Sequence, residues 1–328
     1  MMKLSDWSGI LVYIEIQNKI VHPVGIELLS EAHRLAQKSC EKVYALAIGS
    51  QVESVKEQLW GYPVEEVFLY EIEGEFQPDI YEEPVEECIR KLRPSIVLIG
   101  GTAQGRALAS RIAVEFRTGV TADCTKLQIN EKNQLVQIRP AFGGNIMASI
   151  LTENTRPQLA TVRQKIFLPM IRNEFYHTVF HFQKISSVKK KIKILEIQEV
   201  NEEGSIAEQD VLVVAGRGVK KREDLEMLRE LAVCLGGKLA SSRALVEKGF
   251  LSAKEQVGLS GISVAPKCMI TCGVSGTVQF QAGMKTTKNI VAINTDPNAR
   301  IFEIAHYPIC ADLYEVVPEL LHLLKTPQ

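Results

Sequence analysis

The chain has 328 residues, of which 46% are hydrophobic and 23% charged, and its 38 basic and 39 acidic side chains leave a formal net charge of −1. This balance lacks the basic surplus typical of nucleic-acid-binding proteins, and no apolar run reaches the roughly 20 residues that a transmembrane helix needs. The length predicts two domains, each large enough for its own core. The seven cysteines are an odd number set mostly in apolar runs, so we expect reduced, buried thiols in a cytoplasmic protein without a targeting segment.

The first half of the chain alternates short apolar runs with amphipathic stretches. Strands are expected at 10–14, 43–49, 66–70 and 95–101, and helices at 25–38, 80–92 and 104–116. This alternation is typical of a parallel sheet covered by helices on both faces, that is, a doubly wound α/β domain. Between 126 and 163 short strands follow one another without helices, which predicts an antiparallel extension of the same sheet.

The composition shifts between the two halves of the chain. A basic run over 189–193 precedes an acidic stretch, and we interpret this region as a linker with solvated lysines. The α/β pattern then restarts, with strands expected at 211–216, 269–273 and 290–294 and helices at 222–235 and 313–324. The predicted organisation is an N-terminal α/β domain over 1–190, a linker over 191–209 and a second doubly wound, mostly parallel-sheet domain over 210–328.

Glycine and small polar residues follow three strands of the predicted C-terminal domain, at 216–220, 273–279 and 294–297. In doubly wound sheets ligands bind at the carboxyl ends of the strands, where glycine lets backbone N–H groups approach a phosphate. The sequence therefore predicts a nucleotide or dinucleotide site in this domain. Neither GxxxxGK[ST] nor GxGxxG occurs, so an NTPase or an ordinary NAD dehydrogenase is not supported.

Two further segments carry polar groups suited to a ligand. Ser241, Ser242 and Arg243 precede an expected helix, where simple helix capping by the serines is the competing interpretation. A polar, glycine-containing loop follows over 256–261. No metal-ligand spacing and no local Ser/His/Asp or Cys/His motif is present, so neither a metal site nor nucleophilic catalysis is expected.

The order and spacing of these motifs over residues 210–320 resemble the FAD domain of the alpha subunit of electron transfer flavoproteins. The motifs are Gly216-Arg217-Gly218, Ser242-Arg243-Ala244, Gln256-Val257-Gly258-Leu259-Ser260-Gly261, Gly273-Val274-Ser275-Gly276-Thr277-Val278-Gln279, Ala282-Gly283-Met284-Lys285, Ile293-Asn294-Thr295-Asp296-Pro297 and Ala311-Asp312-Leu313. The segments 118–123 and 139–144 resemble, more diffusely, the bacterial and archaeal branch of the family that includes electron-bifurcating members.

The resemblance implies that FAD is the cofactor. The implied cofactor-binding residues are Arg217, Gly218, Ser242, Arg243, Gln256, Val257, Gly258, Leu259, Ser260, Gly273, Ser275, Gly276, Thr277, Val278, Gln279, Phe280, Asn294, Asp312 and Leu313. Among them, the residues expected along the pyrophosphate and ribityl chain are Arg217, Ser242, Ser275 and Gln279. Asn294 and Asp312 are expected at the adenosine end.

Two residues are implied beside the isoalloxazine ring. A guanidinium at Arg243 stabilises negative charge on a reduced flavin and so raises its reduction potential. Ser260 stands where the family often has Thr, whose hydroxyl bonds flavin N5. Phe280 departs from the family pattern, which commonly has a His that reaches flavin O2. Since that donor is missing, we expect flavin potentials that differ from those of the usual members.

The resemblance also implies partners. The chain would form a heterodimer with an electron transfer flavoprotein beta subunit that packs on the N-terminal domain, and would exchange electrons with an acyl-CoA dehydrogenase-type or quinone-reductase-type partner. It would be an electron carrier without catalytic residues of its own, within a bifurcating NADH-dependent complex in one branch of the family. The alternatives left open are a stand-alone nucleotide-dependent flavin oxidoreductase and a nucleotide-binding module without redox chemistry.

Overall fold

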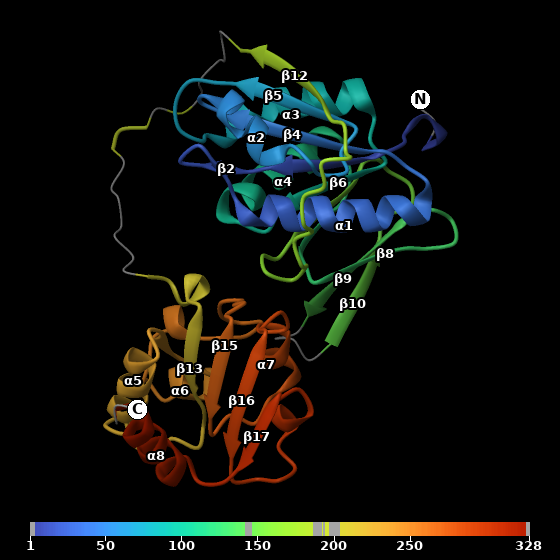
Figure 1. Ribbon diagram of the computed structural model, residues 1–328. Helices are drawn as coiled ribbons and strands as arrows, with labels where there is room; N and C mark the ends of the chain where they lie inside the picture. Colours follow the sequence, from blue (N-terminus) through green and yellow to red (C-terminus); the bar gives the residue numbers. More distant parts are fainter. Residues whose placement is uncertain (1–3, 142–145, 186–191, 193, 197–203, 326–328) are drawn as a thin grey trace. The chain divides into compact units, whose positions relative to one another are not determined.

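The computed structural model describes residues 4–141, 146–185, 192, 194–196 and 204–325. The chain divides into two compact units, the first comprising Met1–Arg139 with Met147–Gln198 and the second Pro140–Ile146 with Glu199–Gln328 (Figure 1). About half of the expected linker, and all of the basic run at 189–193 except residue 192, lie outside the described residues.

The first unit is built on a seven-stranded sheet in the order β12-β5-β4-β1-β6-β11-β7. Its neighbouring strands are parallel throughout. The strands are β1 (Ile10–Ile14), β4 (Val43–Gly49), β5 (Glu66–Glu71), β6 (Ile96–Gly100), β7 (Val120–Cys124), β11 (Gln158–Val162) and β12 (Val179–Lys184). The strands expected at 10–14, 43–49, 66–70 and 95–101 are confirmed, whereas β7 and β12 were not predicted.

Helices cover both faces of this sheet, as the doubly wound prediction requires. They are α1 (Pro23–Ser39), α3 (Pro78–Leu92) and α4 (Ala103–Glu115). Successive side chains of β1 alternate between the faces: Val12 packs in the cluster with α1, and Leu11 packs in the cluster with α3 and α4. Short elements complete the unit, namely η1 (Leu4–Asp6), β2 (Ile16–Gln17), β3 (Ile20–Val21), η2 (Val52–Val55) and α2 (Lys56–Leu59).

The antiparallel extension forms its own three-stranded sheet, in the order β10-β9-β8. Strands β8 (Lys126–Ile129) and β9 (Leu135–Ala141) pair antiparallel, and β10 (Ile146–Leu151) completes the sheet. The expectation that 126–163 would form an antiparallel extension of the main sheet is therefore wrong in two respects: β8, β9 and β10 form a separate sheet, and β11 joins the main sheet in parallel. All five residues of β11 are buried, so this strand is inserted as an inner parallel strand, while β10 exposes most of its residues.

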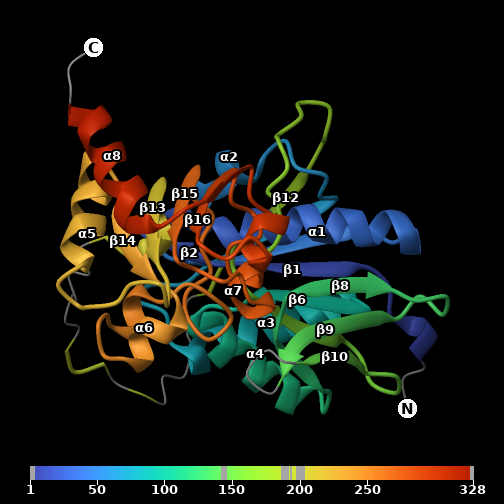
Figure 2. The same cartoon turned by 90° about the horizontal axis from the view of Figure 1, so that it is seen from below.

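The second unit has a five-stranded parallel sheet in the order β14-β13-β15-β16-β17. Figure 2 labels its strands β13 to β16. The strands are β13 (Val211–Ala215), β14 (Lys238–Ser241), β15 (Cys268–Cys272), β16 (Asn289–Asn294) and β17 (Tyr307–Cys310). The helices are α5 (Leu225–Cys234), α6 (Arg243–Glu247), α7 (Val278–Ala282) and α8 (Leu313–Lys325), and the 3-10 turns are η4 (Ile206–Glu208), η5 (Ala253–Glu255) and η6 (Arg300–Glu303).

The order of these strands places a topological switch point between β13 and β15. From β13 the chain passes to β14 on one side and then returns to β15 on the other. Helices α5 and α8 pack against one face of the sheet, whereas the 257–264 loop and α7 pack against the other. Turns from both directions therefore diverge above the carboxyl ends of β13 and β15, which is where doubly wound sheets bind ligands.

Some of the thiol groups are not buried as predicted. All seven cysteines are free, but Cys40, Cys234 and Cys310 are exposed, so the expectation of buried thiols is wrong for these three. Each lies at or next to the end of a helix or strand, where the chain leaves the core. In the described part of the chain, no helix combines the length and apolar character needed to cross a membrane.

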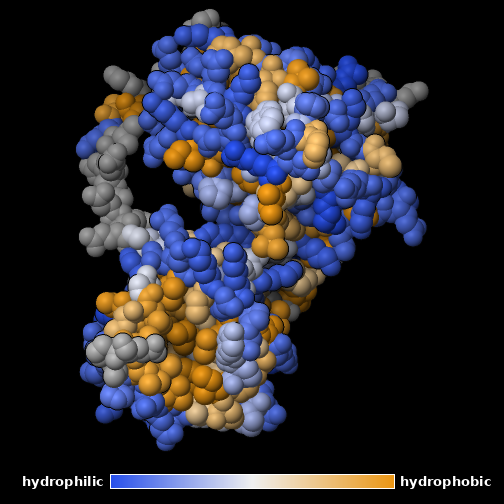
Figure 3. Space-filling model, viewed as in Figure 1, coloured by the Kyte–Doolittle hydropathy of each residue, from blue (hydrophilic) through white to orange (hydrophobic). Residues whose placement is uncertain are grey.

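Large apolar side chains are also exposed on each unit. In the first unit, Ile171 is 91% and Phe175 87% exposed, on the segment that connects β11 to β12. In the second unit, Val233, Leu323 and Leu324 are exposed on α5 and α8, and Figure 3 shows apolar residues gathered over this unit. Contiguous exposed apolar patches are often sites where a protein contacts other molecules.

A buried carboxylate ties the segment after β11 to α1. The backbone N–H of Lys165 donates to Glu27 Oε2 at 2.8 Å, and Glu27 is only 6% exposed. Burial raises the pKa of Glu27 to about 7, against the opposing effect of the backbone N–H groups of residues 165–167. The folded state therefore resists ionisation of this side chain.

We predict that Glu27→Gln removes a pH-dependent loss of stability. A carboxyl whose pKa is raised on folding stabilises the folded state at low pH. This stabilisation is lost as the pH rises through the pKa of the folded state, and for Glu27 the loss is roughly 3 kcal/mol. Urea unfolding at pH 5 and pH 8 should show that the free energy of unfolding of the variant increases relative to that of the wild type as the pH rises. The control Glu31→Gln should instead destabilise at pH 8, because Glu31 pairs with Arg34. Equal effects of Glu27→Gln at both pH values would contradict the prediction.

Candidate functional site

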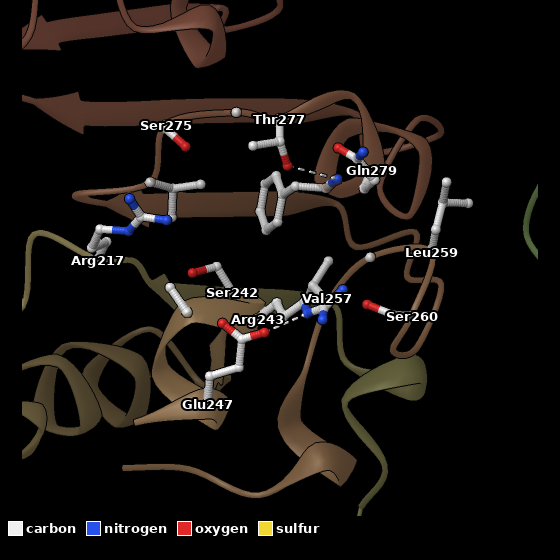
Figure 4. Close-up of a pocket in the computed structure, with 15 residues that line it drawn as sticks. Arg217, Ser242, Arg243, Glu247, Val257, Leu259, Ser260, Ser275, Thr277 and Gln279 are labelled. Atoms are coloured by element: carbon white, nitrogen blue, oxygen red, sulfur yellow. Dashed lines mark hydrogen bonds and ion pairs between the residues drawn. The ribbon is translucent and has the colours of Figure 1, made fainter. Parts of the chain in front are cut away.

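A cavity of about 480 Å³ lies in the second unit at the switch point. Figure 4 shows Ser275 and Thr277 on one wall, and Arg217, Ser242 and Ser260 on the opposite side. The lining residues are Arg217, Ser242, Arg243, Ala244, Glu247, Val257, Gly258, Leu259, Ser260, Val274, Ser275, Gly276, Thr277, Gln279 and Phe280. Most residues singled out from the sequence thus lie around one cavity.

Two turns next to the cavity, after β13 and after β15, make close backbone contact. Gly216 N donates to Cys272 O at 2.9 Å, and Gly218 N donates to Gly273 O at 3.1 Å. A Cβ added at Gly216 would lie 2.2 Å from Gly273 O. Glycine at these positions is therefore required by the packing of the turn after β13 against the turn after β15, in addition to any approach of a ligand.

Ser242 is held at the rim by its backbone. Its N–H donates to Ala215 O at 2.9 Å, which continues the contact between β13 and β14. It is the N-cap residue of α6, but its side chain makes no capping hydrogen bond. The capping interpretation is therefore wrong for the Ser242 side chain, whose hydroxyl lines the cavity.

The loop after η5 brings a second hydroxyl to the cavity. Val257 N donates to Ser241 O at 2.9 Å, which anchors the loop to β14. Gln256 Nε2 donates to Ser260 Oγ at 2.8 Å. Because this bond uses a lone pair of the hydroxyl oxygen, the Ser260 hydrogen stays available for donation to a ligand.

The third wall follows β15. Gly276 adopts φ +75°, and a Cβ added there would lie 2.3 Å from Ile301 N. Thr277 is the N-cap of α7, and its side chain accepts a hydrogen bond from Phe280 N at 3.4 Å. Phe280 is buried within the core and also lines the cavity. An apolar ring thus occupies the position where the resemblance implied a His donor.

Several sequence-predicted residues do not line this cavity: Gly218, Gln256, Gly273, Val278, Asn294, Asp312 and Leu313. Gly218, Gly273 and Gln256 support the turns described above. The side chain of Asn294 donates to Val274 O at 2.8 Å and accepts from Asp296 N at 2.9 Å, so it braces the turns after β15 and β16. Asp312 Oδ1 accepts from Tyr314 N at 3.0 Å at the start of α8.

Three lining residues are not among the predicted cofactor-binding residues: Ala244, Val274 and Glu247. Ala244 and Val274 are neighbours of predicted residues in the chain. Glu247 lies four residues after Arg243 on α6, and its Oε1 accepts a hydrogen bond from Arg243 Nε at 2.8 Å. The i,i+4 spacing of an acidic and a basic residue could have indicated this pair.

The chemistry of the lining suits a large anionic ligand. It holds two guanidinium groups, at Arg217 and Arg243, and the hydroxyls of Ser242, Ser260 and Ser275, against the single carboxylate of Glu247. Guanidinium groups and hydroxyls are donors that bind phosphate oxygens well. Among the described residues no group of acidic, histidine or cysteine side chains could hold a metal ion.

Comparison with known protein families identifies the family of this chain. Residues 10–199 match the electron transfer flavoprotein domain, and residues 205–285 match the electron transfer flavoprotein FAD-binding domain. The chain belongs to the electron transfer flavoprotein alpha-subunit family. Its second unit is accordingly an FAD-binding domain, and its role is electron transfer.

Similar proteins extend over nearly the whole chain. The LctC subunit of lactate dehydrogenase (NAD(+),ferredoxin) from Acetobacterium woodii is 43% identical, over 99% of this chain and 78% of its own length. The electron transfer flavoprotein alpha subunit of Thermoanaerobacterium thermosaccharolyticum is 38% identical, over 98% of this chain and 99% of its own. Protein FixB of Clostridium saccharobutylicum is 38% identical, over 99% and 98% respectively.

We predict that Gly276→Ala disrupts the cavity wall. The added Cβ meets Ile301 N and imposes strain at positive φ, so the variant should lose at least about 2 kcal/mol in urea unfolding and retain less FAD. Gly236→Ala is the matched control, because Gly236 also has positive φ but nothing within 4 Å of an added Cβ. Equal losses in both variants would show that the contact with Ile301 is unimportant.

A clamp from α8 fixes the segment that follows Arg217. Tyr314 Oη donates to Asp224 Oδ2 at 2.5 Å and accepts from Lys220 N at 2.9 Å. Lys221 N donates to the same Asp224 oxygen at 3.0 Å. The hydrogen bond from Tyr314 lowers the pKa of Asp224, while burial and the nearby carboxylate raise the pKa of Tyr314.

Tyr314→Phe should therefore loosen the turn that carries Arg217. Losing about 1 kcal/mol of hydrogen bonding predicts FAD binding weaker by roughly fivefold in a fluorescence titration. Tyr307→Phe, on an exposed tyrosine of β17, is the control and should bind FAD like the wild type. Unaltered affinity in Tyr314→Phe would mean that the clamp does not support the site.

Proposed function

We propose that the 480 Å³ cavity binds the FAD of this subunit and that its polar lining orients the cofactor for electron transfer. The observation that carries the proposal is the convergence of two guanidinium groups and several hydroxyls at the switch point of the FAD-binding domain. Arg217, Ser242, Ser275 and Gln279 would hold the pyrophosphate and ribityl chain. Asn294 and Asp312, which lie outside the cavity lining, would bind the adenosine end.

The ring end of the cofactor would lie beside Arg243 and Ser260. The bond from Gln256 leaves the Ser260 hydroxyl poised to donate, which suits an acceptor such as flavin N5 in the oxidised cofactor. The Arg243 guanidinium would favour added negative charge on the flavin, because a cation held close to the ring stabilises a nearby anion. FAD supplies the electron-carrying chemistry, and the protein sets its orientation and potential.

The chain would act as one subunit of a heterodimer with a beta subunit. The exposed apolar side chains of both units, such as Ile171, Phe175 and Leu323, support a protein partner of this kind. We propose a docking domain over 1–190, a linker over 191–209 and the FAD domain over 210–328. Redox exchange with an acyl-CoA dehydrogenase-type or quinone-reductase-type protein would then need no acid–base residue on this chain.

A second candidate is membership of a bifurcating complex. LctC, named as a subunit of a lactate dehydrogenase that uses NAD(+) and ferredoxin, supports this candidate through 43% identity. In either case the chain itself is a carrier subunit. A stand-alone flavin oxidoreductase is the alternative against which the carrier must be tested.

The test is to co-express the full chain with a candidate beta subunit and to count flavins by visible absorbance. We expect a stable heterodimer in which this chain retains one FAD. Arg243→Ala should lower the flavin reduction potential measured by redox titration, because a cation beside the ring is lost.

The control is Arg229→Ala, an arginine of α5 that pairs with Glu226 outside the cavity lining. It should leave the potential unchanged. A chain that holds no flavin would refute the proposed site. A flavin-loaded chain that is reduced by NADH at full rate without a partner would instead support the stand-alone oxidoreductase.

A further inference from the structure

The Arg243–Glu247 pair has an arrangement that helix energetics does not explain. Arg243 is the first and Glu247 the last residue of α6. A helix dipole favours acidic residues at the start and basic residues at the end, so both charges lie at the unfavourable ends. The basic residue also precedes the acidic one, which is the weaker order for an i,i+4 pair.

The stability of the fold does not explain the pair either. Both side chains are 61% exposed, and ion pairs at that exposure contribute little to the stability of a fold. Yet both residues line the cavity, where Glu247 is the lone carboxylate among the lining residues (Figure 4). A carboxylate in a site for an anionic cofactor weakens anion binding unless it does something else there.

The geometry of the pair indicates the role of Glu247 in the cavity. Glu247 Oε1 accepts from Nε of Arg243, and the other guanidinium nitrogens remain for a ligand because arginine has five N–H donors in a fixed fork. A ligand that fills the cavity would also displace water from the pair, and the Coulomb interaction between the two charges would strengthen as water leaves.

We propose that Glu247 is a positioning residue that fixes the direction of the Arg243 guanidinium and offsets part of its charge, thereby lowering the reduction potential of the bound flavin. The inference rests on the proposed placement of FAD beside Arg243. It assigns to this chain an opposing pair of groups, in which Arg243 raises the potential and Glu247 limits the rise.

The central experiment compares flavin potentials in the FAD-loaded full chain, purified with its partner subunit. Glu247→Gln keeps an acceptor for Arg243 Nε but removes the negative charge. We expect a higher potential, with the reduction equilibrium shifted about tenfold, or about 30 mV for two electrons, and an unchanged FAD content. Glu226→Gln, which removes a carboxylate paired with Arg229 on α5, is the matched control and should leave the potential unchanged.

Two further variants separate positioning from a general change in charge. Glu247→Ala removes the anchor as well as the charge, so FAD affinity should fall roughly three- to tenfold. In an Arg243→Ala background, Glu247→Gln should shift the potential by less than half as much, because the released carboxylate is screened by water.

The outcomes distinguish this inference from the proposed function. If Arg243→Ala itself leaves the potential unchanged, the placement of the flavin beside Arg243 is wrong. If Arg243→Ala lowers the potential but Glu247→Gln leaves it unchanged, only the role of Glu247 is overturned. An equal shift from Glu247→Gln with and without Arg243 would also overturn the positioning role, since the carboxylate would then act on the flavin alone.

Discussion

The site depends on the close backbone contact between the turns that follow β13 and β15. Gly216, Gly218 and Gly273 let these turns approach until Gly218 N bonds Gly273 O, a distance at which an added Cβ would collide with the neighbouring backbone. That contact places Arg217 and Ser275 on either side of one cavity. The remaining walls are attached to it through hydrogen bonds from Ser242 N to Ala215 O and from Val257 N to Ser241 O.

The two units share a doubly wound architecture but differ at the carboxyl end of the first strand. In the first unit, the residue after β1 is Glu15, which is buried and accepts hydrogen bonds from Thr102 Oγ1 and Gln17 Nε2. The hydroxyl that Glu15 engages belongs to Thr102, the N-cap residue of α4, and a carboxylate beside this helix end disfavours a second anion there. In the second unit the corresponding turn carries Gly216 and Arg217, and the charge there is positive. The two doubly wound sheets therefore present different chemistry at the end of their first strand, because the chemistry of a site depends on the residues placed on the fold.

Much of this arrangement could be predicted from the sequence. The strands at 10–14 and 43–49 were predicted to the residue, because a short continuous apolar run bounded by glycine or polar residues is typical of a buried strand. The motifs that surround the cavity were also recognisable, because they join strands to turns in a set order. Strand β12 could not be predicted, because its residues are mostly exposed and only its pairing with β5 makes it part of the sheet. Likewise, nothing local shows that Gln158–Val162 inserts between β6 and β7.

The sequence by itself determined the fold class, the two-unit organisation of alternating strands and helices, and the family, because hydrophobic periodicity and motif order are properties of the chain. Only the tertiary structure decided which polar residues share one cavity. It separated Ser242, whose hydroxyl is exposed to the cavity, from Asn294, whose amide braces two turns. It also revealed Glu247 beside Arg243. The physical reason is that strand order and side-chain direction determine which segments surround a cavity, even though the contact between Arg243 and Glu247 itself follows from their i,i+4 spacing.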